Sequence, residues 1–149
     1  MIEKIYIPTV RRAKNQITFN NLPDELKKRV IMVVESGERH LYNYDCEYLE
    51  IPEEIVGKWT QLAETRKFIH KHAGNIKYAM IDDDIVINRR NTKYWTGISN
   101  MDRSRRKATK DEISLMYEQV SKWLDEPDIG IVGLSTPDVP PGSKEYHDT

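Results

Sequence analysis

The chain has 149 residues, of which 38% are hydrophobic and 32% are charged, and its formal net charge is −1. That length suits one domain with one hydrophobic core. The single cysteine, Cys46, excludes a disulfide within the chain and suits a reducing cytosol. No apolar run is long enough for a membrane span, and the first residues, MIEKIYIPTV, lack the layout of a signal peptide. We therefore expect a cytoplasmic protein without a membrane partner.

Apolar runs and helical periodicity alternate along the chain. Strands are expected at residues 4–10, 30–36, 47–52, 77–87 and 129–135. Helices are expected at residues 57–75 and 110–126, the latter behind the capping-box sequence Thr109-Lys110-Asp111-Glu112, and a short helix or a turn is expected at residues 20–29. Residues 91–108 have little periodicity and are expected to form a loop. The alternation predicts an α/β fold with a mainly parallel sheet flanked by helices, in one domain at residues 1–137 followed by a flexible tail at 138–149.

Three adjacent carboxylates, Asp82, Asp83 and Asp84, interrupt an apolar run in the stretch YAMIDDDIVINRR. They would repel one another unless a cation or several hydrogen-bond donors lay beside them. They can form a solvated turn or cap a helix, but the β-branched residues that follow favour a strand. The pattern favours a site for Mg²⁺ or Mn²⁺ at the carboxyl end of a strand, where open α/β sheets bind ligands.

Arg66 falls in the middle of an apolar stripe in the expected helix at residues 57–75. The stripe consists of Trp59, Leu62, Ala63, Ile69 and Ala73. A buried guanidinium is costly unless it is paired, so Arg66 either makes a structural ion pair, extends to the rim, or reaches a phosphate or the Asp cluster.

Further polar residues follow the first two expected strands. Thr9, Arg11 and Arg12 follow the first strand, and Glu35 follows the second. In a parallel sheet these residues lie along the same edge as the Asp cluster, where they can supply donors for a phosphate or base and an acid for a ribose. The alternative is that strand ends are simply polar.

Residues 88–110 carry eight basic residues and one acid, so the segment holds a charge of about +7 and the remainder about −8. Charge runs are commonly solvated surface. The segment follows the Asp cluster directly, however, and can instead contact DNA or another phosphate. The candidate contacts are Arg89, Arg90, Arg103, Arg105 and Arg106.

Four segments in this order, IYIPTVRR, LPDELKKRVIMVVESGE, GKWTQLAETRKFI and YAMIDDDIVINRR, resemble the nucleotide-sugar-binding half of GT-A glycosyltransferases. They look most like the phage group of TET-associated glycosyltransferases, which act on hypermodified pyrimidines in DNA. The resemblance covers roughly residues 2–90. It implies a GT-A-like domain, a nucleotide-sugar donor of the UDP-sugar type, a hydroxymethylated pyrimidine in DNA as acceptor, and the host cytoplasm as the compartment.

The resemblance also implies roles for individual residues. Asp82 and Asp84 match the DxD motif, whose acids hold Mn²⁺ or Mg²⁺ on the diphosphate, while Asp82 and Asp83 contact the nucleotide sugar. The remaining matches to the nucleotide pocket are Thr9, Arg11, Glu35 and Arg66. No residue is implied as the catalytic base. Because the chain reaches only Thr149, we expect a short or truncated form without the usual acceptor-binding half.

Three other functions compete with this one. Residues 82–86 also fit the DxDx[TV] signature of haloacid-dehalogenase-like phosphatases, which use Mg²⁺ but usually carry the motif on their first strand. A nucleotidyltransferase would commonly have a glycine-rich loop after the first strand, which is missing here. The third alternative is a non-catalytic module that binds a nucleotide or DNA.

Overall fold

The structure, a computed structural model, describes residues 1–90 and 105–133. Its centre is a parallel four-stranded sheet in the order β3-β2-β1-β4. The strands are β1 (Lys4–Pro8), β2 (Val30–Glu35), β3 (Glu47–Ile51) and β4 (Tyr78–Met80). The expected α/β fold with a parallel sheet, consistent with a GT-A-like domain, is confirmed. Residues 91–104 of the loop expected at 91–108, and the tail expected at 138–149, lie outside the described residues.

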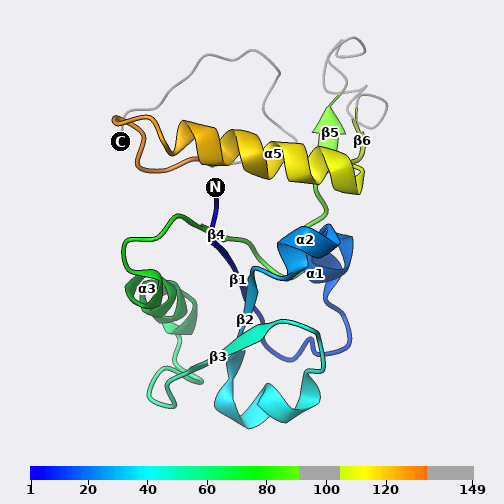
Figure 1. Ribbon diagram of the computed structural model, residues 1–149. Helices are drawn as coiled ribbons and strands as arrows, with labels where there is room; N and C mark the ends of the chain where they lie inside the picture. Colours follow the sequence, from blue (N-terminus) through cyan, green and yellow to red (C-terminus); the bar gives the residue numbers. More distant parts are fainter. Residues whose placement is uncertain (91–104, 134–149) are drawn as a thin grey trace, which may run out of the picture.

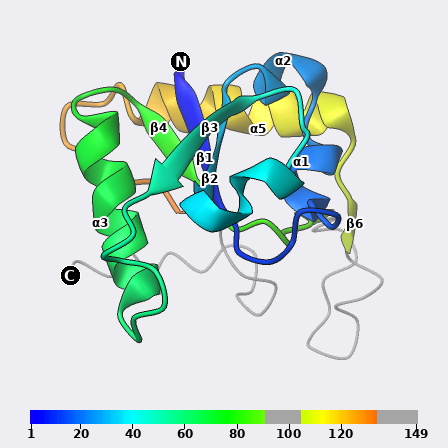
Figure 2. The ribbon, with the colours of Figure 1, turned by 90° about the horizontal axis from the view of Figure 1, so that it is seen from below.

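Helices cover both faces of this sheet (Figures 1 and 2). One face carries α1 (Ile17–Asn21), α2 (Asp24–Lys27) and α5 (Lys110–Trp123), and the other carries α3 (Gln61–Ala73). The 3-10 helix η1 (Ser36–Leu41) joins β2 to β3. Two short antiparallel strands, β5 (Asn88–Arg90) and β6 (Arg105–Lys107), precede α5. Among the described residues no helix is long and apolar enough to cross a bilayer.

The alternation of side chains along β2 shows why both faces need a helical cover. Val30, Met32 and Val34 join the core beneath α1, α2 and α5. Ile31 and Val33 join the core beneath α3. A strand that is buried on both faces is apolar without interruption, as the run VIMVV is. This burial fixes the middle of the sheet and therefore the positions of the strand ends.

One of the expected strands is shorter than predicted, and another, expected at residues 129–135, is no strand in its described part. The strand expected at residues 77–87 ends at Met80, and Asp83 and Asp84 lie in a turn. The alternative of a turn is therefore confirmed, but the turn is not solvated throughout, because Asp83 is buried. Residues 129–133 form no strand: the Ile129 amide donates to the carbonyl of Glu126, and the side chain of Ile131 is 92% exposed. The β-branched residues of that run favour a strand, but the turns after α5 do not bring the run beside an edge strand of the sheet, so it has no partner.

The expected apolar stripe on α3 is wrong in its first half, whereas Ile69 and Ala73 are buried as expected. The buried face consists of Thr65, Ile69 and Ala73, spaced four residues apart. Trp59 precedes the helix and is 97% exposed, and Leu62 is 60% exposed. The first turn of α3 borders the cleft described below, so its apolar residues have no sheet to pack against. Arg66 consequently lies at the border of the buried face, where its side chain is half exposed.

The sequence signals for helix formation are weak at the short helix α1 and strong at the start of α5. Helix α1 was not expected, because its five residues ITFNN carry no helical periodicity. The loop expected at residues 91–108 is wrong at residues 105–107, which form strand β6. By contrast, the capping box is confirmed: the Thr109 side chain accepts from the Glu112 amide, and Glu112 accepts from the Thr109 amide. Buried Ile113 and Tyr117 fasten α5 to the core, and burial raises the pKa of Tyr117 to about 12.

The packing of α5 on the sheet gives the first prediction. Ile113→Ala should lower the free energy of unfolding by about 2–5 kcal/mol, because it removes a fully buried side chain from the core. Leu115→Ala, in the same helix but with a side chain that is 62% exposed, should change it by less than about 0.5 kcal/mol. Urea denaturation measures both values. Equal losses in the two variants would contradict the observed orientation of α5.

Candidate functional site

A cleft of about 480 Å³ opens at the carboxyl ends of β1 and β4. It lies at the point where the chain order reverses, since β2 pairs with one side of β1 and β4 with the other. Ligands of open α/β sheets bind at such switch points. The lining residues come from the end of β1, the sheet floor, the start of α3 and the segment after β4: Pro8, Thr9, Val10, Arg12, Val33, Ile51, Gln61, Leu62, Thr65, Arg66, Asp82, Asp83 and Asp84.

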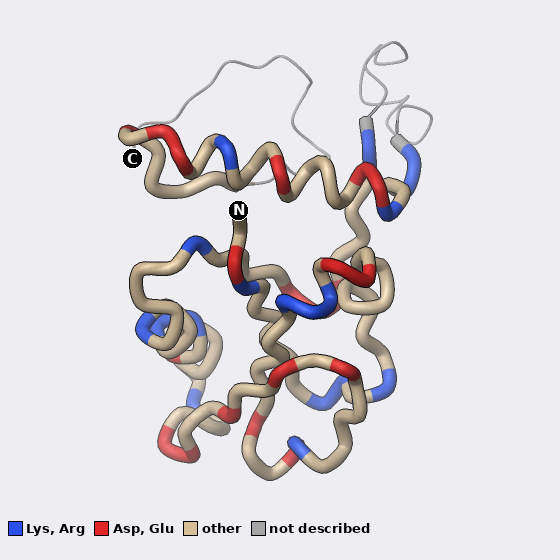
Figure 3. Tube along the Cα trace, in the orientation of Figure 1, with Lys and Arg blue, Asp and Glu red and all other residues tan. Residues whose placement is uncertain are grey.

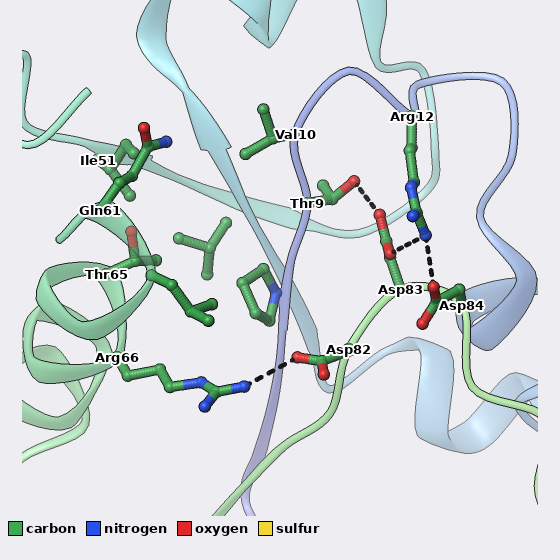
Figure 4. Close-up of a pocket in the computed structure, with 13 residues that line it drawn as sticks. Thr9, Val10, Arg12, Ile51, Gln61, Thr65, Arg66, Asp82, Asp83 and Asp84 are labelled. Carbon is green, nitrogen blue, oxygen red and sulfur yellow. Dashed lines mark hydrogen bonds and ion pairs between the residues drawn. The ribbon is translucent and has the colours of Figure 1, made fainter. Parts of the chain in front are cut away.

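The acid turn, residues 82–84, follows β4 and has one buried member. Asp83 is 6% exposed. Thr9 Oγ1 donates to its Oδ2 at 2.6 Å, and Arg12 Nη1 donates to its Oδ1 at 3.0 Å (Figure 4). These donors compensate a carboxylate that would otherwise be costly to bury. Asp83 therefore ties the acid turn to the end of β1.

The other two members of the acid turn are half exposed and face different cations. Asp82 points toward α3, where Arg66 Nη2 lies 3.4 Å from its Oδ1, and Asp84 lies 2.7 Å from Arg12 Nη1 (Figure 4). Their side chains are 51% and 48% exposed, respectively. The hydrogen bond from Arg12 lowers the pKa of Asp84, so that its carboxylate is held ionised. Each exposed acid thus has one arginine beside it.

Thr18 in α1 holds the backbone of the acid turn through hydrogen bonds of its amide and hydroxyl groups. Its amide donates to the carbonyl of Asp83 at 2.9 Å, and its Oγ1 donates to the carbonyl of Asp82 at 2.5 Å. The amide of Ile85 donates to the same Oγ1 at 2.8 Å. Thr18 is 1% exposed, so these bonds are shielded from water. Sequence reasoning missed Thr18, because helix α1 itself carried no signal.

Gln16 is a second residue that sequence reasoning missed. It is fully buried, and its Nε2 donates to Thr9 Oγ1 at 2.7 Å and to the carbonyl of Arg12 at 3.0 Å. Among the described residues no partner is found for its Oε1. These bonds brace the loop after β1, where Arg11 has a φ of 57°. The brace fixes the direction in which Arg12 leaves the loop.

The predicted site residues do not all reach the cleft. Thr9, Arg66 and the three acids line it. Arg11 is exposed outside the lining, and its amide donates to Glu38 at 2.7 Å. Glu35 also lies outside the lining, where it accepts a 2.6 Å hydrogen bond from Gln61. Arg12, which was expected at the same edge of the sheet, and Gln61, which was not, line the cleft.

Two of the five candidate DNA contacts, Arg89 and Arg106, form ion pairs within the protein. Arg89 and Arg106 pair with Glu112 in the first turn of α5, the latter at 2.6 and 2.8 Å, and basic β5 and β6 stand beside that acidic turn in Figure 3. These bonds, together with the Thr109 amide, hold the pKa of Glu112 well below its usual range. Of the others, Arg90 and Arg105 lie on β5 and β6, and Arg103 is outside the described residues.

Within residues 1–90 and 105–133, no group of three or more Asp, Glu, His or Cys side chains is arranged to hold a metal ion. The acid turn offers two outward carboxylates, which are divided between Arg66 and Arg12. Two carboxylates do not enclose a cation by themselves, so any metal here would need oxygen ligands from a bound molecule.

Comparison with known families supplies the identity. The family model described as TET-Associated Glycosyltransferase matches residues 3–138. Neither curated proteins nor solved structures gave a match. The family match favours glycosyl transfer over the phosphatase and nucleotidyltransferase alternatives, and the cleft stands where a parallel α/β domain binds its ligand. The chain belongs to the TET-associated glycosyltransferase family and is a glycosyltransferase.

Proposed function

We propose that the cleft binds the diphosphate of a nucleotide sugar together with Mn²⁺ or Mg²⁺, and that the enzyme transfers the sugar to a hydroxyl group. A glycosyltransferase family implies a nucleotide-sugar donor. The observation that carries the proposal is the arrangement of two half-exposed carboxylates, Asp82 and Asp84, between two arginines at the switch point. Carboxylates suit a divalent cation, and guanidinium groups suit phosphate.

The donor set fits a cation that arrives with a phosphate. Mg²⁺ and Mn²⁺ prefer oxygen ligands, and Mg²⁺ is commonly held by one or two carboxylates with substrate phosphates and water completing the shell. Asp82 and Asp84 supply those carboxylates, and their side chains are half exposed. When bound, the metal would neutralise charge on the departing diphosphate.

Arg66 is proposed to bind the diphosphate from the α3 side of the cleft. Its only acidic partner among the described residues is Asp82, at 3.4 Å. An exposed pair of this kind contributes about 0–1 kcal/mol to stability, which gives little structural reason for placing an arginine there. Gln61 lines the cleft on the α3 side and is a candidate for contact with the nucleoside end, with Glu35 orienting it, while Thr9 holds Asp83 in place. A UDP sugar is the proposed donor.

The proposed acceptor is the hydroxyl of a hydroxymethylated pyrimidine in phage DNA. The basic segment at residues 88–110 supports this choice, because eight cations against one acid attract a polyanion. Arg89 and Arg106 are paired with Glu112, and Lys110 is paired with Asp24. The DNA contacts are therefore proposed for the other cations that the sequence places in this segment, Arg90, Lys93, Arg103, Arg105 and Lys107.

Removal of either exposed acid tests the metal site. Asp82→Asn and Asp84→Asn should each weaken the Mn²⁺-dependent binding of UDP by at least about tenfold, because each removes an anionic ligand. Asp45→Asn is the matched control, since Asp45 is exposed and precedes β3 at the opposite end of the sheet. Isothermal titration calorimetry measures all three. If both variants bind Mn²⁺ and UDP as the control does, the metal assignment fails.

Replacement of Arg66 tests the diphosphate contact. Arg66→Met should change the free energy of unfolding by less than about 1 kcal/mol, because its ion pair is exposed. It should nevertheless weaken UDP binding by at least about tenfold. Lys67→Met removes a neighbouring exposed cation of α3 and should leave UDP binding unchanged. Thermal melts and calorimetry on the same samples separate the two effects, and equal UDP affinity in both variants would refute the role of Arg66.

The salt dependence of DNA binding tests the acceptor. Arg103→Gln combined with Arg105→Gln should flatten the slope of log affinity against log salt by up to about two units, since each phosphate contact on duplex DNA contributes about 0.9. The control variant, Lys28→Gln with Lys71→Gln, removes the same charge from exposed positions elsewhere. A gel-shift titration decides the matter. Absence of DNA binding at low salt, or equal slopes in both variants, would remove this segment from the acceptor site.

A further inference from the structure

We infer that Arg12 is a second diphosphate-binding residue, which neutralises Asp84 in the free enzyme and moves to the phosphate when the metal and nucleotide arrive. The inference rests on the proposed function of the cleft. It assigns Arg12 two successive partners, and it predicts that the metal and the diphosphate bind cooperatively.

The first step is the unused capacity of the Arg12 side chain. A single nitrogen, Nη1, contacts both Asp83, at 3.0 Å, and Asp84, at 2.7 Å. Within the part of the chain that the structure describes, Nη2 and Nε of Arg12 make no hydrogen bond to protein. The guanidinium group carries five N–H donors in a rigid fork. Because the side chain is 45% exposed and lines the cleft, those donors are available to a phosphate.

The second step is the inequality of the two acids that Arg12 contacts. Asp83 is buried and is also held by Thr9, whereas the Asp84 side chain is 48% exposed. An exposed ion pair contributes little to stability, so the bond to Asp84 can be exchanged at small cost. The bond to Asp83 keeps Arg12 beside the acid turn while this happens.

The third step is the rigidity of the backbone beneath these side chains. Buried Thr18 bonds to the backbone of Asp82, Asp83 and Ile85. Buried Gln16 bonds to the carbonyl of Arg12 at 3.0 Å. With both loops held at their main chains, the exchange is confined to the side chains of Arg12 and Asp84.

The consequence is that the metal and the diphosphate should bind together more readily than the metal binds alone. A cation alone must compete with Arg12 for Asp84, so Arg12 should oppose binding of the metal by itself. A cation with a diphosphate brings anionic oxygens that accept from Arg12 and leave Asp84 free for the metal. Coupling between the two ligands is then reciprocal, because each strengthens the other by the same factor.

Calorimetry tests this account. The three titrations are of Mn²⁺ alone, of Mn²⁺ with UDP and of Mn²⁺ with inorganic pyrophosphate. Arg12→Met should bind Mn²⁺ alone at least about threefold more tightly, since a competing cation is gone. It should bind both Mn²⁺–UDP and Mn²⁺–pyrophosphate at least about tenfold more weakly, so that the coupling collapses. Arg11→Met is the matched control: the neighbouring arginine is exposed outside the cleft lining, and all three affinities should stay at the wild-type value.

Three results would overturn the inference. They are unchanged affinity for Mn²⁺–UDP in Arg12→Met, a parallel loss of Mn²⁺ alone and Mn²⁺–UDP, or a loss confined to UDP with pyrophosphate binding intact. The second would mean that Arg12 only positions the acids, and the third that it contacts the nucleoside. Failure of the wild-type enzyme to bind Mn²⁺ with UDP would overturn the proposed function as well.

A conservative variant covers the case in which Arg12→Met does not fold, since Asp83 would lose a charged partner. Arg12→Lys keeps a positive charge beside Asp83 but loses the guanidinium fork. It should melt near the wild-type temperature and still bind Mn²⁺–UDP at least about threefold more weakly. Wild-type affinity in Arg12→Lys, with Arg11→Lys as its control, would overturn the guanidinium contact with the diphosphate.

Discussion

The compensation of three adjacent carboxylates after β4 is the constraint on which the rest of the site depends. The negative charge of the three acids is compensated in two different ways. Asp83 is buried and receives two donors, while Asp82 and Asp84 stay half exposed with one arginine each. Hence the inner acid contributes to the fold, and the side chains of the outer two stay accessible from the cleft.

The parallel sheet brings the compensating groups together. Because β1 lies between β2 and β4, the loop after β1 faces the acid turn and delivers Thr9 and Arg12 to it. The crossover from β3 to β4 places α3, with Arg66, on the other side. The connection from β1 to β2 contributes α1, whose Thr18 fixes the turn from below. The β1–β2 and β3–β4 connections, together with the segment after β4, therefore supply the side chains of the site.

The sequence allowed the α/β class, the central strands and the acid cluster at a strand end to be predicted, because continuous burial of a strand leaves an unbroken apolar run. It did not allow Arg12 to be chosen over Arg11, since that depends on the φ of 57° at Arg11 and on the brace from Gln16. Periodicity also misplaced Arg66, because Trp59 is exposed before the start of α3 and Leu62 lines the cleft instead of joining the core. Thr18 acts through hydrogen bonds of its hydroxyl and amide with main-chain groups of the acid turn, which is far away in the sequence, and no local pattern predicts such bonds.

The central claim is that the two outward acids hold a cation shared with the diphosphate of the donor. A crystal structure of the enzyme grown with Mn²⁺ and UDP, with the manganese located by its anomalous scattering, tests this claim most directly. The account predicts one manganese peak ligated by Asp82 and Asp84 and by oxygens of the diphosphate, with Arg66 and Arg12 on the phosphates. A manganese ion bound away from both carboxylates, or UDP bound outside the cleft between β1 and β4, would contradict it.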